Sequence, residues 1–159
     1  MNRQTVPMWP IALARIAIGA LWLFSLRWKL PPNFMPATGP GLMDWLEAEA
    51  QYPAVPLYGH LVERFVIPHF TPFAWAIFLA ELLVGLSLLT GTFTRIGAAL
   101  GLLMALNLGI GLLDVPGEWP WSYVMLAMWH GLFLVAAAGR LWGVDQWLRA
   151  RGWLPNWIG

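Results

Sequence analysis

The chain has 159 residues, of which 59% are hydrophobic and 11% are charged, and its mean hydropathy is +0.63. A soluble domain of this size needs far more charge on its surface, so the composition predicts an integral membrane protein. The absence of cysteine excludes disulfides, thiol redox chemistry, and any iron–sulfur cluster or covalently attached haem held by this chain. The formal net charge of +1 gives no indication of nucleic-acid binding, so no nucleic-acid partner is expected.

The first apolar segment covers residues 9–29 and stops at two prolines, Pro31 and Pro32. It contains Arg15, and Gly19 follows one helical turn later. A cleaved signal peptide has a shorter apolar core, no arginine inside that core and a small-residue cleavage site after it. The segment is therefore predicted to be a retained transmembrane helix.

The loop from residue 31 to residue 69 is polar enough to leave the membrane, but two parts of it have a helical period. Leu42 and Leu46 lie on one apolar face, and a second apolar stripe runs from Leu57 to Val66. We expect two short amphipathic helices that lie on the membrane surface or cap the bundle. Simple packing between spans and a dedicated partner site are both compatible with this pattern.

The second span, residues 72–90, carries one carboxylate, Glu81, among about twenty otherwise apolar residues, a length that spans a bilayer. Thr71 followed by Pro72 predicts the start of the helix, and Gly91 predicts its end. A carboxylate near the membrane midplane costs several kcal/mol unless it is protonated or paired. Glu81 is therefore expected to be either a functional group or half of an inter-helix pair.

The third span, residues 95–114, follows a tight turn and is predicted to be an antiparallel neighbour of the second. Small residues recur along it at every fourth position, and this spacing lets another helix approach closely. These residues are Gly97, Gly101, Ala105 and Gly109. Asn107 lies on the opposite face and is expected to meet another helix or a cofactor, since an amide turned toward lipid would be unsatisfied.

The fourth span, residues 121–138, has His130 at its centre, and Tyr123 lies two turns earlier on the same face. The tail, residues 140–159, alternates apolar and charged side chains and is predicted to form an interfacial helix. The chain as a whole, 1–159, is expected to be one all-α domain. It would be an integral membrane four-helix bundle, with short amphipathic helices in the first extramembrane loop and at the C-terminus.

The distribution of basic residues predicts the orientation of the bundle. Five of them lie on the side of the termini, against three on the other side, which favours cytoplasmic termini in the inner membrane. The five are Arg3, Arg95, Arg140, Arg149 and Arg151, and the three are Arg27, Lys29 and Arg64.

Four spans each carry one polar residue at a similar depth, roughly 9 to 18 Å from the side of the termini at about 1.5 Å per residue. These residues are Arg15, Glu81, Asn107 and His130. Polar groups at one depth in a small bundle tend to meet, so we expect Glu81 to be coupled to Arg15. His130 is expected to be either a packing hydrogen bonder or a proton carrier. The three histidines lack the spacing of a metal site, and their placement disfavours haem ligation.

Three passages carry a resemblance to a known family: LARIAIGALWLFSLRWKL, FLAELLVGLSLLTGTFTRIGAALGLL and AAGRLWGVDQWL. In this order they resemble the DoxX family of small four-helix membrane proteins, and the last passage is most similar to the DoxD branch. The positions that carry the family pattern are Arg15, Gly19, Glu81, Gly85, Gly91, Arg95, Arg140 and Asp145.

The resemblance implies a membrane subunit of a quinone-linked oxidoreductase. The DoxD branch is known from a thiosulfate:quinone oxidoreductase, which passes electrons from thiosulfate to membrane quinone and yields tetrathionate. It also implies a second protein subunit on the extracytoplasmic side, or a larger membrane complex. Many family members have no assigned activity, so a non-catalytic membrane anchor or assembly subunit is the alternative.

In the enzyme interpretation, a membrane quinone is the cofactor, and no metal is expected. The catalytic roles fall on three residues: Glu81 and His130 would exchange protons, and Arg15 would hold the developing anion. The residues expected to bind the quinone ring are Asn107, Tyr123 and Trp129. In the anchor interpretation, Arg15 and Glu81 form an internal pair.

Overall fold

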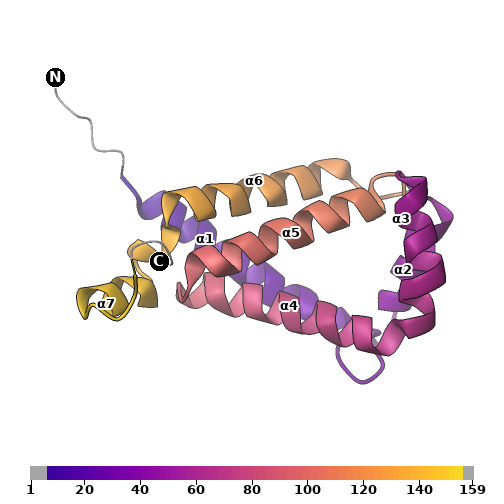
Figure 1. Ribbon diagram of the computed structural model, residues 1–159, viewed down its shortest axis with the longest axis horizontal. Coiled ribbons are helices and arrows are strands. Elements are labelled where there is room, and N and C mark those ends of the chain that lie inside the picture. The colour runs from indigo at the N-terminus through magenta and orange to yellow at the C-terminus, as the bar shows by residue number, and fades with distance from the viewer. Residues whose placement is uncertain (1–6, 156–159) are drawn as a thin grey trace.

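The computed structural model describes residues 7–155, and over these residues it consists of helices, turns and loops (Figure 1). The long helices are α1 (Trp9–Ser25), α4 (Phe70–Thr90), α5 (Thr94–Leu112) and α6 (Pro120–Ala136). The predicted all-α fold is confirmed.

Three of the helical stretches are long and apolar enough to cross a membrane: Trp9–Trp28, Pro56–Thr90 and Thr94–Leu112. The fourth, α6, is a shorter apolar helix of 17 residues that packs along α5. Large apolar side chains remain exposed on the outer faces of these helices, with Leu103 65% exposed and Val135 79% exposed. Such extensive apolar exposure suits association with a lipid bilayer.

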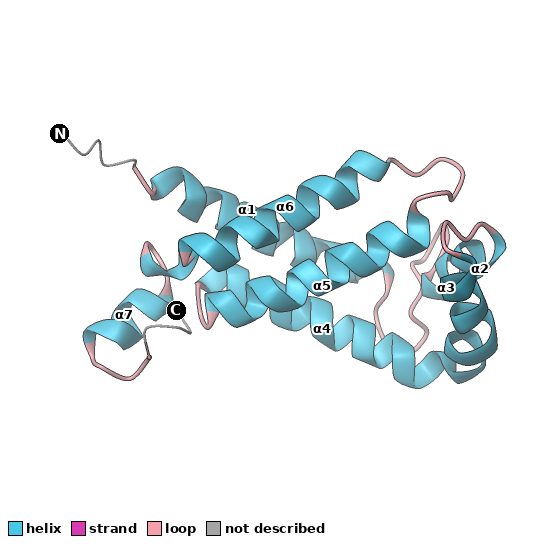
Figure 2. Ribbon diagram, turned by 45° about the horizontal axis from the view of Figure 1, so that its top comes forward, coloured by secondary structure: helices cyan, strands magenta, loops and turns pink. Residues whose placement is uncertain are grey.

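The long helices are arranged as two antiparallel pairs, α1 with α4 and α5 with α6, joined by the tight turn between α4 and α5 (Figure 2). Glycines allow close contact within the first pair. A Cβ atom at Gly19 would lie 2.5 Å from the backbone nitrogen of Leu89, and one at Gly85 would lie 2.6 Å from Leu23. The two helices therefore pack backbone to backbone at these positions.

The start of α4 differs from the prediction. Helical turns continue without a break from α3 (Pro56–Leu61) through a π turn (Val62–Val66) and a 3-10 turn (Ile67–His69) into α4. Thr71 is thus inside the helix, and its prediction as the N-cap is wrong. A helix that began at Thr71 would leave its first backbone N–H groups without partners, whereas the preceding turns supply carbonyls for them. The predicted end is confirmed, because Gly91 adopts a left-handed conformation with a φ of 69°.

The two short helices expected in the loop are present as α2 (Leu42–Gln51) and α3, and both lie across one end of the bundle (Figure 1). Leu42 and Leu46 of α2 pack with Phe34 and Val62 in a small apolar core. The larger core lies between the long helices and includes Trp22, Val84, Leu88 and Phe133. The loop helices therefore cap the bundle and close the space between the pairs at that end.

The tail contains α7 (Val144–Ala150), at the end of the bundle opposite α2 and α3 (Figure 1). The first turn of α1 lies at the same end as α7. The predicted interfacial helix over residues 140–159 is thus shorter than expected, and residues 156–159 lie outside the described part of the chain. Arg3, which entered the predicted orientation, also lies outside it.

Candidate functional site

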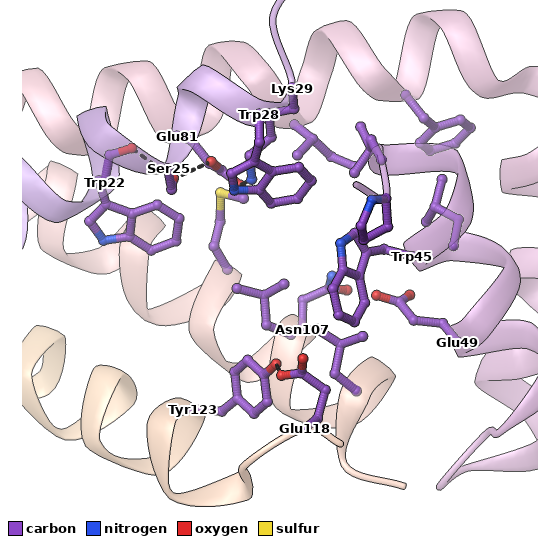
Figure 3. Close-up of a pocket in the computed structure, with 18 of the residues that line it drawn as sticks. Trp22, Ser25, Trp28, Lys29, Trp45, Glu49, Glu81, Asn107, Glu118 and Tyr123 are labelled. Carbon is purple, nitrogen blue, oxygen red and sulfur yellow. Dashed lines mark hydrogen bonds and ion pairs between the residues drawn. The ribbon is translucent and has the colours of Figure 1, made fainter. Parts of the chain in front are cut away.

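A cavity of about 1110 Å³ lies between the two helix pairs, at the end covered by α2 and α3. Most of its lining is apolar or aromatic, including Trp22, Trp28 and Trp45 (Figure 3). The polar groups on its walls include Ser25, Lys29, Glu49, Glu81, Asn107 and Tyr123. An apolar pocket with a few convergent polar groups is the usual form of a small-molecule site.

Glu81 lies on one side of the cavity, where both of its carboxylate oxygens are occupied (Figure 3). Lys29 Nζ lies 2.5 Å from Oε1, and the Ser25 hydroxyl donates to Oε2 over 3.1 Å. The side chains of Lys29 and Glu81 are only 6% and 1% exposed. Each charge thus compensates the other in a buried setting, where an unpaired charge would be costly.

Arg15 does not form the predicted pair with Glu81. Its Nη2 donates instead to the backbone carbonyl of Trp142, 2.9 Å away, and its guanidinium lies against Gly91. Gly91 is ten residues beyond Glu81, which corresponds to about 15 Å along a helix. In the prediction, the depth of each polar residue is measured from the end of its own span. Because the ends of α1 and α4 are not level, Arg15 faces the turn after α4 rather than Glu81.

Lys29 is a site residue that was not expected from the sequence, where it is only one of the basic residues that flank the first span. It follows Ser25 by four residues, and the helical turn Leu26–Trp28 carries the chain on from α1. Ser25 and Lys29 therefore lie on the same face, one turn apart, and both reach Glu81. That i, i+4 spacing next to an intramembrane acid is the signal that could have identified the pair.

His130 is buried between helices and does not line the cavity. Its Nε2 accepts a hydrogen bond from the indole N–H of Trp22 over 3.0 Å, and its Nδ1 lies 2.7 Å from the carbonyl oxygen of Leu126. An indole N–H can only donate, so the proton of the imidazole is on Nδ1 and is donated to Leu126. Both ring nitrogens are thus occupied, Nε2 by α1 and Nδ1 by the preceding turn of α6, which favours the packing role over the proton carrier.

Of the three residues expected to bind a quinone ring, two line the cavity. Asn107 Oδ1 lies 3.3 Å from the hydroxyl oxygen of Tyr58, and the hydroxyl of Tyr123 donates to Glu118. Trp129 lies elsewhere: its ring stacks on Phe133 at 5.8 Å between centroids, beside the larger core. Trp129 therefore belongs to helix packing and not to the lining of the cavity.

Glu49 of α2 is a second acid on the cavity lining, and it is not among the residues expected from the sequence. Its side chain is buried and accepts a hydrogen bond from Tyr58 over 3.1 Å. Burial away from water raises the pKa of Glu49 to about 7, although the Tyr58 hydrogen bond acts in the opposite direction. The spacing of Leu42, Leu46 and Glu49 (i, i+4, i+7) places this acid on the apolar face of the helix, a signal available in the sequence.

Arg15 belongs to a separate cluster at the opposite end of the bundle. The carboxylate of Asp145 accepts hydrogen bonds from the backbone N–H groups of Phe93 and Thr94, at 2.7 and 2.9 Å. The backbone N–H of Asp145 donates to the carbonyl of Gly91 over 2.9 Å. These bonds attach α7 to the turn between α4 and α5, so this cluster holds the tail in place.

No group of three or more acidic or histidine side chains within residues 7–155 is arranged to hold a metal ion. The chain matches no protein-family model, no curated protein and no solved structure.

Proposed function

We propose that this chain is a membrane subunit of a quinone-linked oxidoreductase and that the cavity binds the headgroup of a membrane quinone. The observation that carries the proposal is the cavity itself, about 1110 Å³ in volume, bordered by apolar helices and lined by aromatic and hydrogen-bonding side chains. A quinone headgroup is a flat ring with two carbonyl oxygens, and it needs aromatic or apolar contact along with hydrogen-bond donors.

The residues around the cavity fit such a ring. The indoles of Trp28 and Trp45 border the open space and offer faces for stacking (Figure 3). Lys29, which holds Glu81, lines the cavity and has further N–H groups that can donate to a bound molecule, and Ser25 lines the cavity beside it. Asn107 adds an amide from α5 on another side. These groups replace Arg15, His130 and Trp129, which lie away from the cavity.

A quinone bound there would supply the electron acceptor, taking two electrons and two protons to become the quinol. The resemblance to the DoxX family supports thiosulfate as the donor. Two thiosulfate ions would each lose one electron and join through a new sulfur–sulfur bond as tetrathionate. In this proposal the thiosulfate is oxidised on a second subunit outside the inner membrane, and this chain holds the acceptor and excludes water from it.

The test is binding of a short-chain benzoquinone to the purified protein in lipid nanodiscs. Leu108→Trp fills part of the cavity, because Leu108 lines it, whereas Leu106 is 50% exposed on the outer face of the same helix. We expect Leu108→Trp to weaken binding at least tenfold, about 1.4 kcal/mol, and Leu106→Trp to leave it within about twofold. Thermal unfolding of both variants checks that each is folded.

The alternative is a non-catalytic membrane anchor or assembly subunit. It predicts no saturable quinone binding by the wild-type protein and no quinone extracted with it from native membranes. That result, obtained with folded protein, would contradict the proposed function. Equal binding by Leu108→Trp and wild type would show that any quinone site lies outside the cavity.

A further inference from the structure

The acid on the α2 side of the cavity has a role that the Lys29–Glu81 pair cannot fill. We infer that Glu49 exchanges protons between a molecule bound in the cavity and the water at the α2/α3 end of the protein. This inference rests on the proposed function, because it identifies the residue through which quinone reduction at this site would take up its protons.

Glu81 is poorly suited to carry a proton. Both of its oxygens are occupied, by Lys29 at 2.5 Å and by Ser25 at 3.1 Å, and the ammonium group compensates its charge. Protonation of Glu81 would leave the Lys29 ammonium buried without a counter-charge, which is strongly unfavourable. The Lys29–Glu81 pair is therefore suited to orienting a ligand.

The surroundings of Glu49 differ from those of Glu81, which is paired with a cation. Within residues 7–155 no ion pair reaches its carboxyl group, and its hydrogen bond comes from the neutral hydroxyl of Tyr58. The side chain is 5% exposed, and a Cβ atom at Gly111 would lie 2.6 Å from its carboxyl carbon, so α5 covers it closely. Without a cation nearby, burial penalises the charged form and the pKa of Glu49 rises to about 7. Both protonation states are thus accessible near neutral pH.

Charged groups on the neighbouring elements do not compensate Glu49. Tyr58 faces it from α3, and Asn107 and Gly111 face it from α5. Two cations line the cavity elsewhere: Lys29 pairs with Glu81, and Arg27 lies over the ring of Phe24. Glu118 and Tyr123, also on the lining, carry no positive charge. The remaining ionisable side chains of α2, of α3 beyond Tyr58 and of the turns that pack on α2 are exposed; they are Asp44, Glu47, His60, Glu63, Arg64 and His69.

The position of Glu49 connects the cavity with water. Figure 3 shows its carboxyl group on the α2 side of the open space, away from Glu81, with Asn107 nearby. The hydroxyl oxygen of Tyr58 lies 3.1 Å from the carboxylate of Glu49 and 3.3 Å from Asn107 Oδ1 and can give its single proton to either, so the three groups form one polar cluster. Asp44 and Glu47, on the same short helix, are exposed. A proton therefore has only the thickness of α2 to cross between the solvent and the carboxyl group.

The chemical step is a proton transfer that accompanies electron arrival from the sulfur donor. The O–H bond of protonated Glu49 breaks, and a new O–H bond forms on a carbonyl oxygen of the bound quinone. Water at the α2/α3 end then reprotonates Glu49, which can deliver the second proton in the same way. The two electrons come from the two thiosulfate ions, so the sum of the steps is one quinol and one tetrathionate.

The titration of Glu49 can be measured without any quinone. In infrared difference spectra between pH 5 and pH 9, wild-type protein should lose a protonated-carboxyl band with a midpoint near pH 7. The band should be absent in Glu49→Gln and present in Glu47→Gln, the matched change at an exposed position of the same helix. A wild-type protein without this band, or a band that persists in Glu49→Gln, would overturn the inference.

The second measurement is the affinity for a short-chain benzoquinone at pH 6 and at pH 8. Protonated Glu49 can donate to a carbonyl oxygen and ionised Glu49 cannot, so the affinity should fall as pH rises, by up to about tenfold for each unit by which binding raises the pKa. Glu47→Gln should behave as wild type, and Glu49→Gln should bind equally at both values.

The outcomes separate this inference from the proposed function. Wild-type binding that is independent of pH would overturn the role of Glu49 and leave the quinone site standing. Absence of quinone binding at both pH values would overturn both. A Glu49→Gln variant that unfolds is replaced by Tyr58→Phe, which removes the hydrogen bond to the ionised form and should move the infrared midpoint to higher pH.

Discussion

At the scale of single residues, the buried charge of Glu81 is held by Lys29 from the end of the first span. Removal of one partner of a buried ion pair leaves an uncompensated charge and typically costs about 3–5 kcal/mol, while removal of both can be nearly neutral. The 2.5 Å contact between Lys29 Nζ and Glu81 Oε1 makes these two residues the coupled pair of the bundle.

We therefore expect Glu81→Gln and Lys29→Met each to lower the thermal unfolding temperature in mild detergent, and the double variant to recover much of the loss. Arg15→Gln provides the control, because Arg15 bonds Trp142 instead. Its effect should add to that of Glu81→Gln, as is usual for separated sites. Additive effects of the Lys29 and Glu81 changes would show that the two charges do not interact.

Glu49 makes the stability of the protein depend on pH. Its pKa is about 7 in the folded protein, above the ordinary value of 4.5, so the folded state binds more protons between these values. The stability associated with neutral Glu49 is fully present below pH 4.5 and is lost as pH rises through 7. The difference between these two pKa values corresponds to about 3 kcal/mol of folding free energy. Glu49→Gln should thus gain stability relative to wild type at pH 8 and little at pH 4.5.

Denaturation at the two pH values tests this prediction, with Glu47→Gln as the exposed control on the same helix. An equal difference between wild type and Glu49→Gln at both pH values would contradict it.

At the scale of helices, the sequence predicts well where each long helix begins and ends. It predicts poorly how far each helix is displaced along its neighbour. The lengths of the apolar segments and the helix-ending Gly91 predict the ends of the helices to within about two to four residues. Periodicity specifies which residues share a face; Glu81, Asn107 and Tyr123 line the cavity, whereas His130, predicted on the same face as Tyr123, does not. Periodicity contains no information on how far one helix slides along another, so Arg15 was paired with the wrong residue.

The offset between α1 and α4 is set by contacts that only the folded pair reveals. Gly19 and Gly85 let the two backbones meet, and a Cβ atom at Gly19 would lie 2.5 Å from the backbone of Leu89. Backbone atoms cannot rotate away as a side chain can, so the helices would have to separate. The spacing of Glu49 from Leu42 and Leu46 predicts that it lies on the apolar face of α2, but only the folded structure reveals that α5 covers it.

Gly19→Ala should therefore destabilise the protein by about 1–3 kcal/mol, the usual cost of overpacking. Gly131, in α6, is the matched control, because a Cβ atom added there would meet open space, with nothing within 4 Å. Gly131→Ala should be neutral or stabilising by about 0.5–1 kcal/mol, since alanine is the better helix former. Thermal unfolding of the two variants compares them, and equal losses would mean that α1 and α4 are not in close contact at Gly19.

At the scale of the whole molecule, the cavity and the cluster that holds the tail lie at opposite ends of the bundle. The end with α2 and α3 covers the cavity and its acids, and the end with α7 is secured by Asp145 and Arg15 (Figure 1). Glu81 contributes to the cavity, whereas Gly91 and Asp145 hold the tail.

This arrangement predicts opposite membrane exposure for the two ends, and the native absence of cysteine removes any labelling background. Glu47 on α2 and Asp114 after α5 are exposed at the cavity end, and Gln146 on α7 is exposed at the other end. Single changes Glu47→Cys and Asp114→Cys should react with a membrane-impermeant maleimide from the same side, and Gln146→Cys only from the opposite side. The proposed orientation makes the side of Gln146 cytoplasmic. Labelling of Glu47→Cys and Gln146→Cys from one side would contradict a bundle that crosses the membrane along its length.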